Sequence, residues 1–124
     1  EYTKEQVAKM INGDGGFNAY LHTNDMRDVV KMAEDGNSEA QAVMDAFHYQ
    51  LEKEIGAMSV VLGGKVDQII LTGGIAYGEV TTKHMTDAVS FIAPVTVYPG
   101  EDELLALAQG ALRVMTGEEN ALEY

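Results

Sequence analysis

The sequence of 124 residues contains no cysteine, and it has no stretch of about 18 consecutive apolar residues. Without cysteine, the chain can form neither a disulfide framework nor a thiolate metal site, and it has no cysteine nucleophile. The N-terminus also lacks the basic and then apolar arrangement of a signal peptide. These absences predict a soluble cytoplasmic protein, and a first residue that is Glu1 rather than methionine suggests processing or a longer polypeptide.

Positive charge is also scarce. Eight Lys and Arg residues stand against 20 Asp and Glu residues, which gives a net charge of −12, and Arg27 and Arg113 are the only arginines. This balance argues against nucleic acid and anionic membranes as partners. An anionic small ligand would have to be held by backbone N–H groups, a helix N-terminus, a divalent metal or a neighbouring positive domain.

Periodicity and capping patterns predict a helix-rich chain with two clear strands. Capping-box spacing at Thr3 and Ser38 predicts two helix starts, and glycines at positions 36, 63 and 64 predict helix ends. The expected elements, in order, are a short helix from residue 3, a short strand at 17–21, a helix from Asn24 to about Glu34, a long helix from Ser38 to about residue 62, a strand at 68–71, a polar helix at 79–89, a strand at 95–98, and a helix at 102–115.

Apolar spacing also predicts which faces are buried. The stripe expected on the long helix consists of Val43, Phe47, Leu51, Ile55, Met58 and Leu62. The buried residues expected on the last helix are Leu104, Leu107, Ala108, Ala111 and Leu112. His48 lies off the stripe, so we expect it, His22 and His84 to be exposed or partly buried histidines, and the polar tail at 117–124 to fray.

The alternation of strands and helices after residue 68 predicts an α/β fold with parallel strands and flanking helices. Two strands are too few for such a sheet, because sheets usually contain four to six. We therefore expect the rest of the sheet on upstream sequence, and we expect the apolar face left open to be covered by another copy in a homo-oligomer.

The most informative segment is Asp67-Gln-Ile-Ile-Leu-Thr-Gly-Gly-Ile-Ala-Tyr-Gly78, where an apolar strand runs into paired glycines. Gly73 and Gly74 allow positive φ and the close approach of a flat ligand to the backbone. The spacing matches neither the dinucleotide fingerprint nor a P-loop. A tight structural turn and a nucleotide site are both compatible with this pattern.

Two polar segments each have two interpretations. Asn24 and Asp25 can cap a helix, whereas the guanidinium of Arg27 can stack on a base or pair with ribose or phosphate oxygens. Three carboxylates at positions 101–103 can form an acidic first helical turn, or one of them can reach a hydrated Mg²⁺ bound to phosphates.

Four longer stretches together closely resemble the C-terminal part of butyrate kinases, which are relatives of acetate kinases. These stretches are Ala19-Tyr-Leu-His-Thr-Asn-Asp-Met-Arg27, Tyr49-Gln-Leu-Glu-Lys-Glu-Ile-Gly-Ala57, Gly64-Lys-Val-Asp-Gln-Ile-Ile-Leu-Thr-Gly-Gly-Ile-Ala-Tyr77 and Val89-Ser-Phe-Ile-Ala-Pro-Val-Thr-Val-Tyr-Pro-Gly-Glu-Asp-Glu103. The resemblance covers nearly the whole chain. It implies part of a ribonuclease-H-like domain of the actin-like ATPase group, so that residues 1–124 are the C-terminal nucleotide-binding part of a two-domain kinase.

The resemblance also implies roles for individual residues. The adenosine motif maps onto Gly73, Gly74, Ile75 and Ala76. The Asp-Phe-Arg motif of acetate kinases, which contacts the base and ribose, maps onto Asp25, Met26 and Arg27, with methionine in place of the aromatic residue. A metal-associated glutamate of acetate kinases falls on Asp102.

The resemblance therefore implies transfer of a phosphoryl group between ATP and butyrate, with ATP or ADP and Mg²⁺ as cofactors. No counterpart of the family's phosphate loop or catalytic groups is found here, so we expect the isolated segment to be inactive. The alternatives are a kinase for another short or branched carboxylic acid, and a non-catalytic module for nucleotide binding or oligomerisation.

Overall fold

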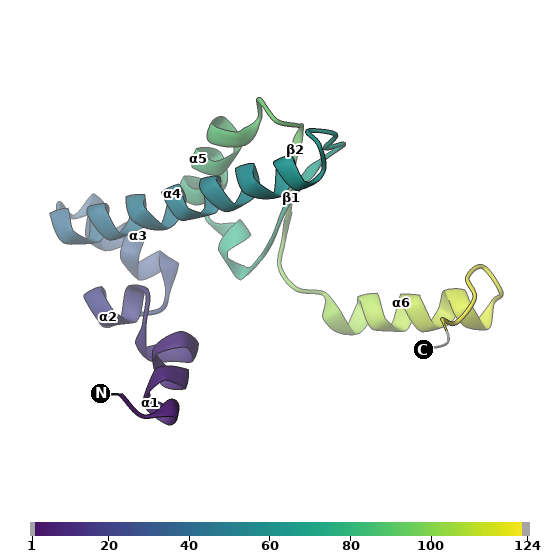
Figure 1. Cartoon of the computed structure of the whole chain (residues 1–124), viewed down its shortest axis with the longest axis horizontal. Coiled ribbons are helices and arrows are strands. Elements are labelled where there is room, and N and C mark those ends of the chain that lie inside the picture. Colours follow the sequence, from purple (N-terminus) through teal and green to yellow (C-terminus); the bar gives the residue numbers. More distant parts are fainter. Residues whose placement is uncertain (1, 123–124) are drawn as a thin grey trace.

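A computed structural model describes residues 2–122 of the chain. Its elements are α1 (Lys4–Lys9), a π-helical turn (Met10–Asp14), α2 (Phe17–Leu21), α3 (Met26–Glu34), α4 (Ser38–Val61), β1 (Ile69–Gly73), the 3₁₀ helix η2 (Gly74–Tyr77), α5 (Glu79–Val89), β2 (Val95–Pro99) and α6 (Glu103–Met115). Figure 1 shows an elongated molecule with α4 along its centre and α6 extending away from the other elements.

From residue 4 to residue 34 the regular elements are all helices. Thr3 caps α1 with the predicted capping box. The strand predicted at 17–21 is wrong, because these residues form α2. A spacing of four places Phe17 and Leu21 on the same side of a helix, where Leu21 is buried and the Phe17 ring lies 5.0 Å from the ring of Phe47 on α4.

One of the two helix caps lies away from its predicted position. Asp25, which was predicted as a cap together with Asn24, caps α3 by accepting a hydrogen bond from the Arg27 N–H. Asn37, rather than Ser38, caps α4 by accepting from two backbone N–H groups of its first turn. Asparagine and aspartate oxygens are among the best N-cap acceptors, so a neighbouring side chain of this kind can displace the serine predicted from spacing alone.

The long helix predicted in the centre is confirmed as α4, but its buried face is different. Ala40, Met44 and His48 form the buried row. Most of the predicted stripe flanks this row and is half-buried, whereas Met58 and Leu62 are more than half exposed. Both α3 and α5 pack on α4. The buried residues of α4 are therefore those that face these two helices.

The predicted parallel pairing is confirmed. β1 and β2 are hydrogen-bonded in parallel, with Ile69 opposite Val95 and Gly73 opposite Pro99. The connection between them contains α5, whose Met85 and Val89 pack under the sheet with Ile69 and Ala93. A second core cluster between α2, α3 and α4 contains Leu21, Met26, Val29, Ala40 and Met44. Residues 2–122 therefore form a helix-rich α/β structure with two parallel strands.

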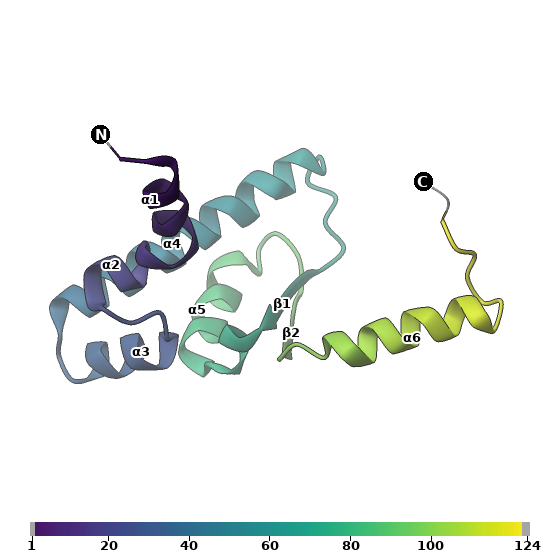
Figure 2. The same ribbon diagram turned by 90° about the horizontal axis from the view of Figure 1, so that it is seen from below.

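The burial predicted for the last helix is wrong. Leu104, Leu107 and Leu112 of α6 are 84%, 71% and 57% exposed, and Ala108 and Ala111 are exposed as well. Figure 2 shows α6 directed away from the two core clusters. The helix has the predicted apolar spacing, but no other element between residues 2 and 122 covers that face.

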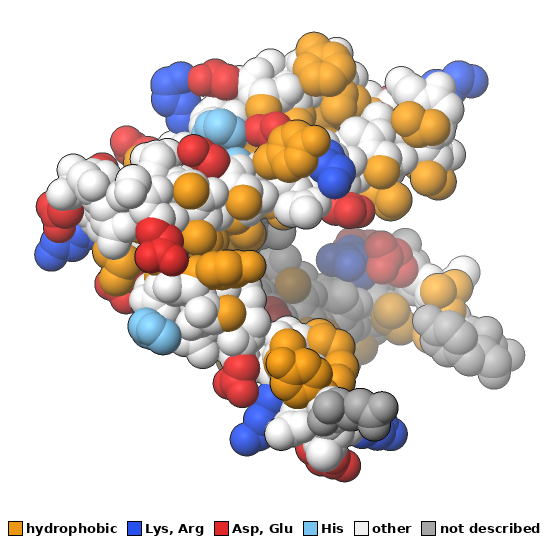
Figure 3. All heavy atoms as spheres, turned by 60° about the vertical axis from the view of Figure 1, so that its left-hand side comes forward, with side chains coloured by type: hydrophobic (Ala, Val, Ile, Leu, Met, Phe, Trp, Pro, Cys, Tyr) orange, Lys and Arg blue, Asp and Glu red, His pale blue; other side chains and the backbone are white. Residues whose placement is uncertain are grey.

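The remaining features of the fold are the exposed side chains and the segment that follows α6. The face shown in Figure 3 carries dispersed acidic side chains, with apolar side chains exposed among them. Residues 117–122 follow α6 as a turn and an irregular tail, and Glu119 of this tail pairs with Arg113 of α6. Positions 123 and 124 of the tail that was predicted to fray lie outside the described residues. Among residues 2–122, none of the helices combines the length and the apolar character needed to span a membrane.

Candidate functional site

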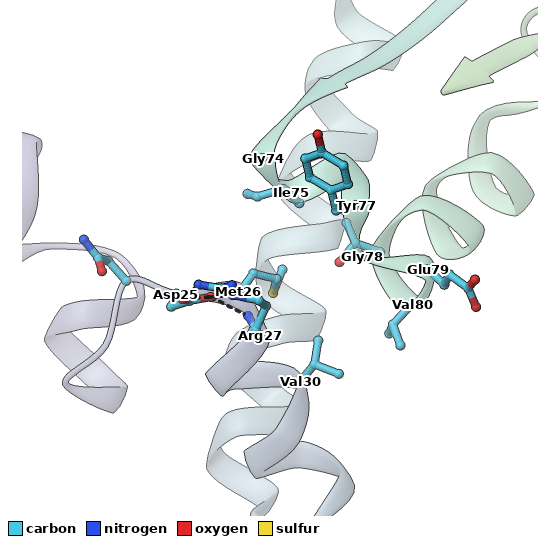
Figure 4. Close-up of a pocket in the computed structure, with 12 residues that line it drawn as sticks. Asp25, Met26, Arg27, Val30, Gly74, Ile75, Tyr77, Gly78, Glu79 and Val80 are labelled. Carbon is cyan, nitrogen blue, oxygen red and sulfur yellow. Dashed lines mark hydrogen bonds and ion pairs between the residues drawn. The ribbon is translucent and has the colours of Figure 1, made fainter. Parts of the chain in front are cut away.

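A cavity of about 820 Å³ lies between the start of α3 and the segment that follows β1. This volume falls within the usual range for small-molecule sites. Figure 4 shows α3 on one side and η2 with the start of α5 on the other. The lining residues are Asn24, Asp25, Met26, Arg27, Val30, Gly74, Ile75, Tyr77, Gly78, Glu79, Val80 and Thr81.

We call the first five of these residues the α3 wall and the lining residues between positions 74 and 81 the glycine wall. The glycine wall begins where β1 ends, at the carboxyl edge of the parallel pair. Ligands of open α/β sheets bind outside the carboxyl ends of the strands, because the loops there bring backbone N–H groups and helix starts together. The cavity therefore lies where such a fold normally binds a ligand.

On the α3 wall, Asp25 and Arg27 form a fixed pair. The Arg27 Nε donates to both carboxylate oxygens of Asp25 at 2.9 and 3.1 Å, and the Arg27 backbone N–H donates to the same side chain. The guanidinium hydrogen bond is the main cause that lowers the pKa of Asp25 to about 2. The Arg27 side chain is nevertheless 90% exposed, so one face of its planar cation stays open to a ligand.

Met26 connects the same wall to the core. It lines the cavity, but it is only 8% exposed because it packs with Val29 and Met44. A thioether that packs against the core on its other side offers a ligand a polarizable apolar surface. It does not present a free ring face for stacking.

On the glycine wall, the two adjacent glycines have different roles. Gly73 has a φ of +85°, which strains any other residue, whereas Gly74 begins η2 without a positive φ. A Cβ on Gly74 would have no heavy atom of the described chain within 4 Å. It would project into open space at the cavity, so Gly74 keeps this part of the backbone accessible.

The cavity brings together five of the seven residues predicted to contact a nucleotide: Asp25, Met26, Arg27, Gly74 and Ile75. The other two, Gly73 and Ala76, do not line it. Ala76 is buried, and Gly73 belongs to β1.

The sequence reasoning did not assign the remaining residues of the glycine wall. Tyr77 is an exposed aromatic residue directly after the glycine turn, and this position was a usable signal for a ligand contact. Gly78 is the N-cap residue of α5 and provides no side-chain cap, and residues 79–81 of the first turn line the cavity. Helix N-termini of this kind favour anions.

The acidic segment at 101–103 lies beside the glycine wall rather than in the cavity. Gly73 and Gly100 exchange two backbone hydrogen bonds of 3.2 and 3.1 Å, which hold the ends of β1 and β2 together. Asp102 is the N-cap residue of α6, but within the described chain its side chain makes no capping hydrogen bond. Residues 2–122 contain no group of three His, Cys, Asp or Glu residues that could hold a metal by itself.

With this geometry established, comparison with known proteins identifies the family. Residues 1–121 match the acetokinase family, and the chain therefore belongs to it. Among its relatives are a probable butyrate kinase of Clostridium botulinum (strain Alaska E43 / Type E3), which is 54% identical, and butyrate kinases 1 and 2 of Clostridium acetobutylicum, which are 55% and 52% identical. Each match covers all 124 residues of this chain and 35% of the relative.

These findings confirm the resemblance to butyrate kinases that was drawn from the sequence. The chain spans about a third of the length of the curated relatives that it matches. The activity of a complete polypeptide is therefore a separate question from family membership.

Proposed function

We propose that this chain is the C-terminal nucleotide-binding part of a butyrate kinase. The reaction is ATP plus butyrate to ADP plus butyryl phosphate, and it is reversible. In this proposal the chain supplies the adenosine pocket, and the phosphate-binding and acid-binding groups lie elsewhere in the full-length polypeptide. Identity above 50% to proteins named as butyrate kinases supports the choice of substrate.

The observation that carries the proposal is the convergence of two distant segments on one cavity. Asp25 and Arg27 precede Gly74 and Ile75 by more than 40 residues, yet all four line the same hollow. The cavity is bounded by apolar side chains, by one tyrosine, by the paired Asp25 and Arg27, by the carboxylate of Glu79 and by open glycine backbone. A nucleoside needs these surfaces, because its base is flat and apolar on its faces and its ribose is polar.

The parallel pair with its helical crossover supports a finer assignment of the fold. We propose that β1, α5 and β2 belong to a ribonuclease-H-like domain of the actin-like ATPase group, and that the chain acts as part of a two-domain cytoplasmic enzyme. The exposed apolar face of α6 is compatible with a covering domain or with a second copy in a homo-oligomer.

Asp102 is our candidate for the metal-associated carboxylate. Mg²⁺ is usually bound through one or two carboxylates together with substrate phosphates and waters, so a single free carboxylate can serve it. Asp102 follows the Gly73–Gly100 bridge, at the carboxyl edge of the strands where the glycine wall also begins. The phosphates of a nucleotide whose adenosine occupies the cavity would supply the remaining ligands.

Two measurements on the full-length polypeptide test the proposal. A coupled assay with ATP, Mg²⁺ and a series of short linear and branched acids should show turnover with butyrate as the preferred acid. Calorimetric titration with ADP should show binding at one site. Preference for another acid would favour the kinase of different specificity, and ADP binding without turnover on any acid would favour the non-catalytic module.

A further inference from the structure

The interface between α4 and α5 contains a buried polar pair. His48 of α4 is 2% exposed and Thr81 of α5 is 4% exposed, and they are the buried polar residues of the described chain. The His48 Nε2 lies 3.2 Å from the Thr81 Oγ1. A hydroxyl group can donate or accept, so this hydrogen bond forms with either neutral tautomer of the histidine.

Thr81 connects this pair to the cavity. It lies in the first turn of α5 and is also part of the glycine wall. The hydrogen bond from α4 therefore holds the residue at which the helix start meets the cavity. If this contact loosens, the first turn of α5 can shift, and the glycine wall shifts with it.

Several charged or titratable groups surround His48. On α5, the ring of His84 stacks on the His48 ring with centroids 4.3 Å apart, and His84 Nε2 lies 2.8 Å from Glu52 Oε1 of α4. On α4, Asp45 also faces this region, and Glu34 of α3 lines a small hollow beside His48. These carboxylates lie at the edge of the His48 environment, whereas the second histidine ring stacks directly on His48.

These surroundings favour a neutral His48. Burial lowers its pKa below the usual 6.5, and the neighbouring His84 adds to this effect, against smaller opposite contributions from Asp45 and Glu52. A loosened α4–α5 contact lets water reach the ring and restores a more ordinary pKa. The loosened form therefore takes up a proton first, and it gains population as the pH falls below about 6.5.

We propose that His48 is a positioning residue that holds the glycine wall through Thr81, so that nucleotide affinity falls when His48 is protonated. This inference rests on the proposed nucleotide function. Between pH 7.5 and pH 5.5, protonation of a histidine with the ordinary pKa raises the ratio of the loosened form to the intact form by up to about tenfold. The apparent nucleotide affinity falls in proportion to the fraction of intact form that is lost.

The test is calorimetric titration of the full-length polypeptide with ADP at pH 7.5 and pH 5.5. We expect the wild-type affinity to fall at least about threefold more than the affinity of His48→Gln, whose amide can still pair with Thr81 but cannot be charged. The protonation of ADP itself is common to both proteins and cancels in this comparison.

Matched variants separate positioning from general effects. His22 is exposed and has a left-handed backbone conformation, which asparagine adopts readily. His22→Asn therefore removes a histidine outside the α4–α5 contact and should keep the wild-type pH profile of ADP affinity. Thr81→Val removes the hydroxyl at nearly constant volume and should lower ADP affinity at pH 7.5. Thr81→Ser keeps the hydroxyl and should keep the ADP affinity near that of the wild type.

The possible results distinguish failure of the His48 inference from failure of the proposed nucleotide function. A pH profile in His48→Gln equal to that of the wild type overturns the inference and leaves the proposed function intact. Absence of ADP binding to the wild type at every pH overturns both. If His48→Gln does not fold, NMR titration of the wild-type histidine replaces it, because linkage requires bound ADP to lower the pKa of His48, and an unchanged value contradicts the inference.

Discussion

The two walls of the cavity are built by different means. The α3 wall presents side chains: a carboxylate paired with an arginine above a buried methionine. The glycine wall presents backbone, with Gly74 open to the cavity and a helix start without a side-chain cap behind it. The first wall can be changed by altering charge, and the second by adding volume.

Each wall also has its own core cluster. Met26 and Met44 support the α3 wall, and Met85 and Val89 support the glycine wall through β1 and α5. The fixed ion pair of the cavity thus belongs to one wall, and the open glycine backbone belongs to the other. Variants of the two walls should therefore have distinct effects.

The largest expected effect tests whether two walls suffice for chemistry. The chain of 124 residues should show no appreciable turnover with ATP, Mg²⁺ and butyrate, because neither wall carries a basic cradle for the γ-phosphate. A coupled assay measures this, with the full-length polypeptide as the positive control. Turnover of about 1–100 per second, which is usual for kinases, would contradict the statement that the site is partial.

The next effect concerns the core behind the glycine wall. Met85 is 1% exposed, and Met85→Ala should lower the free energy of unfolding by about 2–5 kcal/mol. Urea unfolding of the full-length polypeptide measures the change. The matched control is Met115→Ala, since Met115 is 83% exposed on α6 and its replacement in the described structure creates no cavity. Equal losses in the two variants would show that α6 is buried in the complete protein.

Gly74→Val tests the glycine wall itself. A branched side chain would enter the cavity, so the dissociation constant of ADP in the full-length polypeptide should rise at least about tenfold, or roughly 1.4 kcal/mol, while butyrate affinity changes much less. Calorimetry with each ligand measures both. Gly73→Ala is the contrast, because a φ of +85° predicts loss of thermal stability instead. Unchanged ADP affinity in folded Gly74→Val would remove this wall from the binding site.

Arg27→Lys tests the α3 wall. Lysine keeps the charge but cannot form the planar fork with Asp25, so ADP affinity should fall about twofold to fivefold, which corresponds to the range of 1 kcal/mol or less for exposed ion pairs. Arg113→Lys is the control, since Arg113 lies on α6 and pairs with Glu119. The same loss in both variants would show a general effect of replacing arginine by lysine rather than a role of the α3 wall.

The smallest expected effect concerns the acidic segment beside the glycine wall. Asp102→Asn should raise the Mg²⁺ concentration for half-maximal activity by up to about fivefold, because one charge pair is worth about 1 kcal/mol in water. ADP affinity without metal should not change. Glu103→Gln, one residue further on, serves as the control. An unchanged Mg²⁺ titration in Asp102→Asn would leave this segment with a structural role at a helix start.

Local patterns predicted much of the fold. The helix at 79–89, the long central helix and the parallel pairing depend on spacing and turn residues within a short window, and all three are confirmed. The segment 17–21 failed, because five residues of mixed polarity do not distinguish a strand from a helical turn until α4 provides a surface for Phe17. Burial failed at α6 for the opposite reason, since apolar spacing cannot supply the partner that covers it.

The residues of the candidate site, like the elements of the fold, were predicted only in part. The family resemblance pointed to Asp25, Arg27 and the glycine turn, but the contribution of Thr81 depends on how α5 packs, which no local pattern encodes. His48 shows this limit most clearly. Its position off the predicted stripe indicated an exposed or partly buried residue, yet the contact between α4 and α5 buries it almost completely.

The length of α4 has a consequence for the energetics of recognition. Its 24 residues form a rod of about 36 Å, with α3 packed along one part and α5 along another. The two walls are thus mounted on a single rigid support, and the gap between them is largely set when the chain folds. A ligand that fits this gap loses little affinity to ordering of the protein, which is the advantage of preorganisation. With the His48–Thr81 contact intact, recognition at this cavity should resemble a lock and key more than an induced fit.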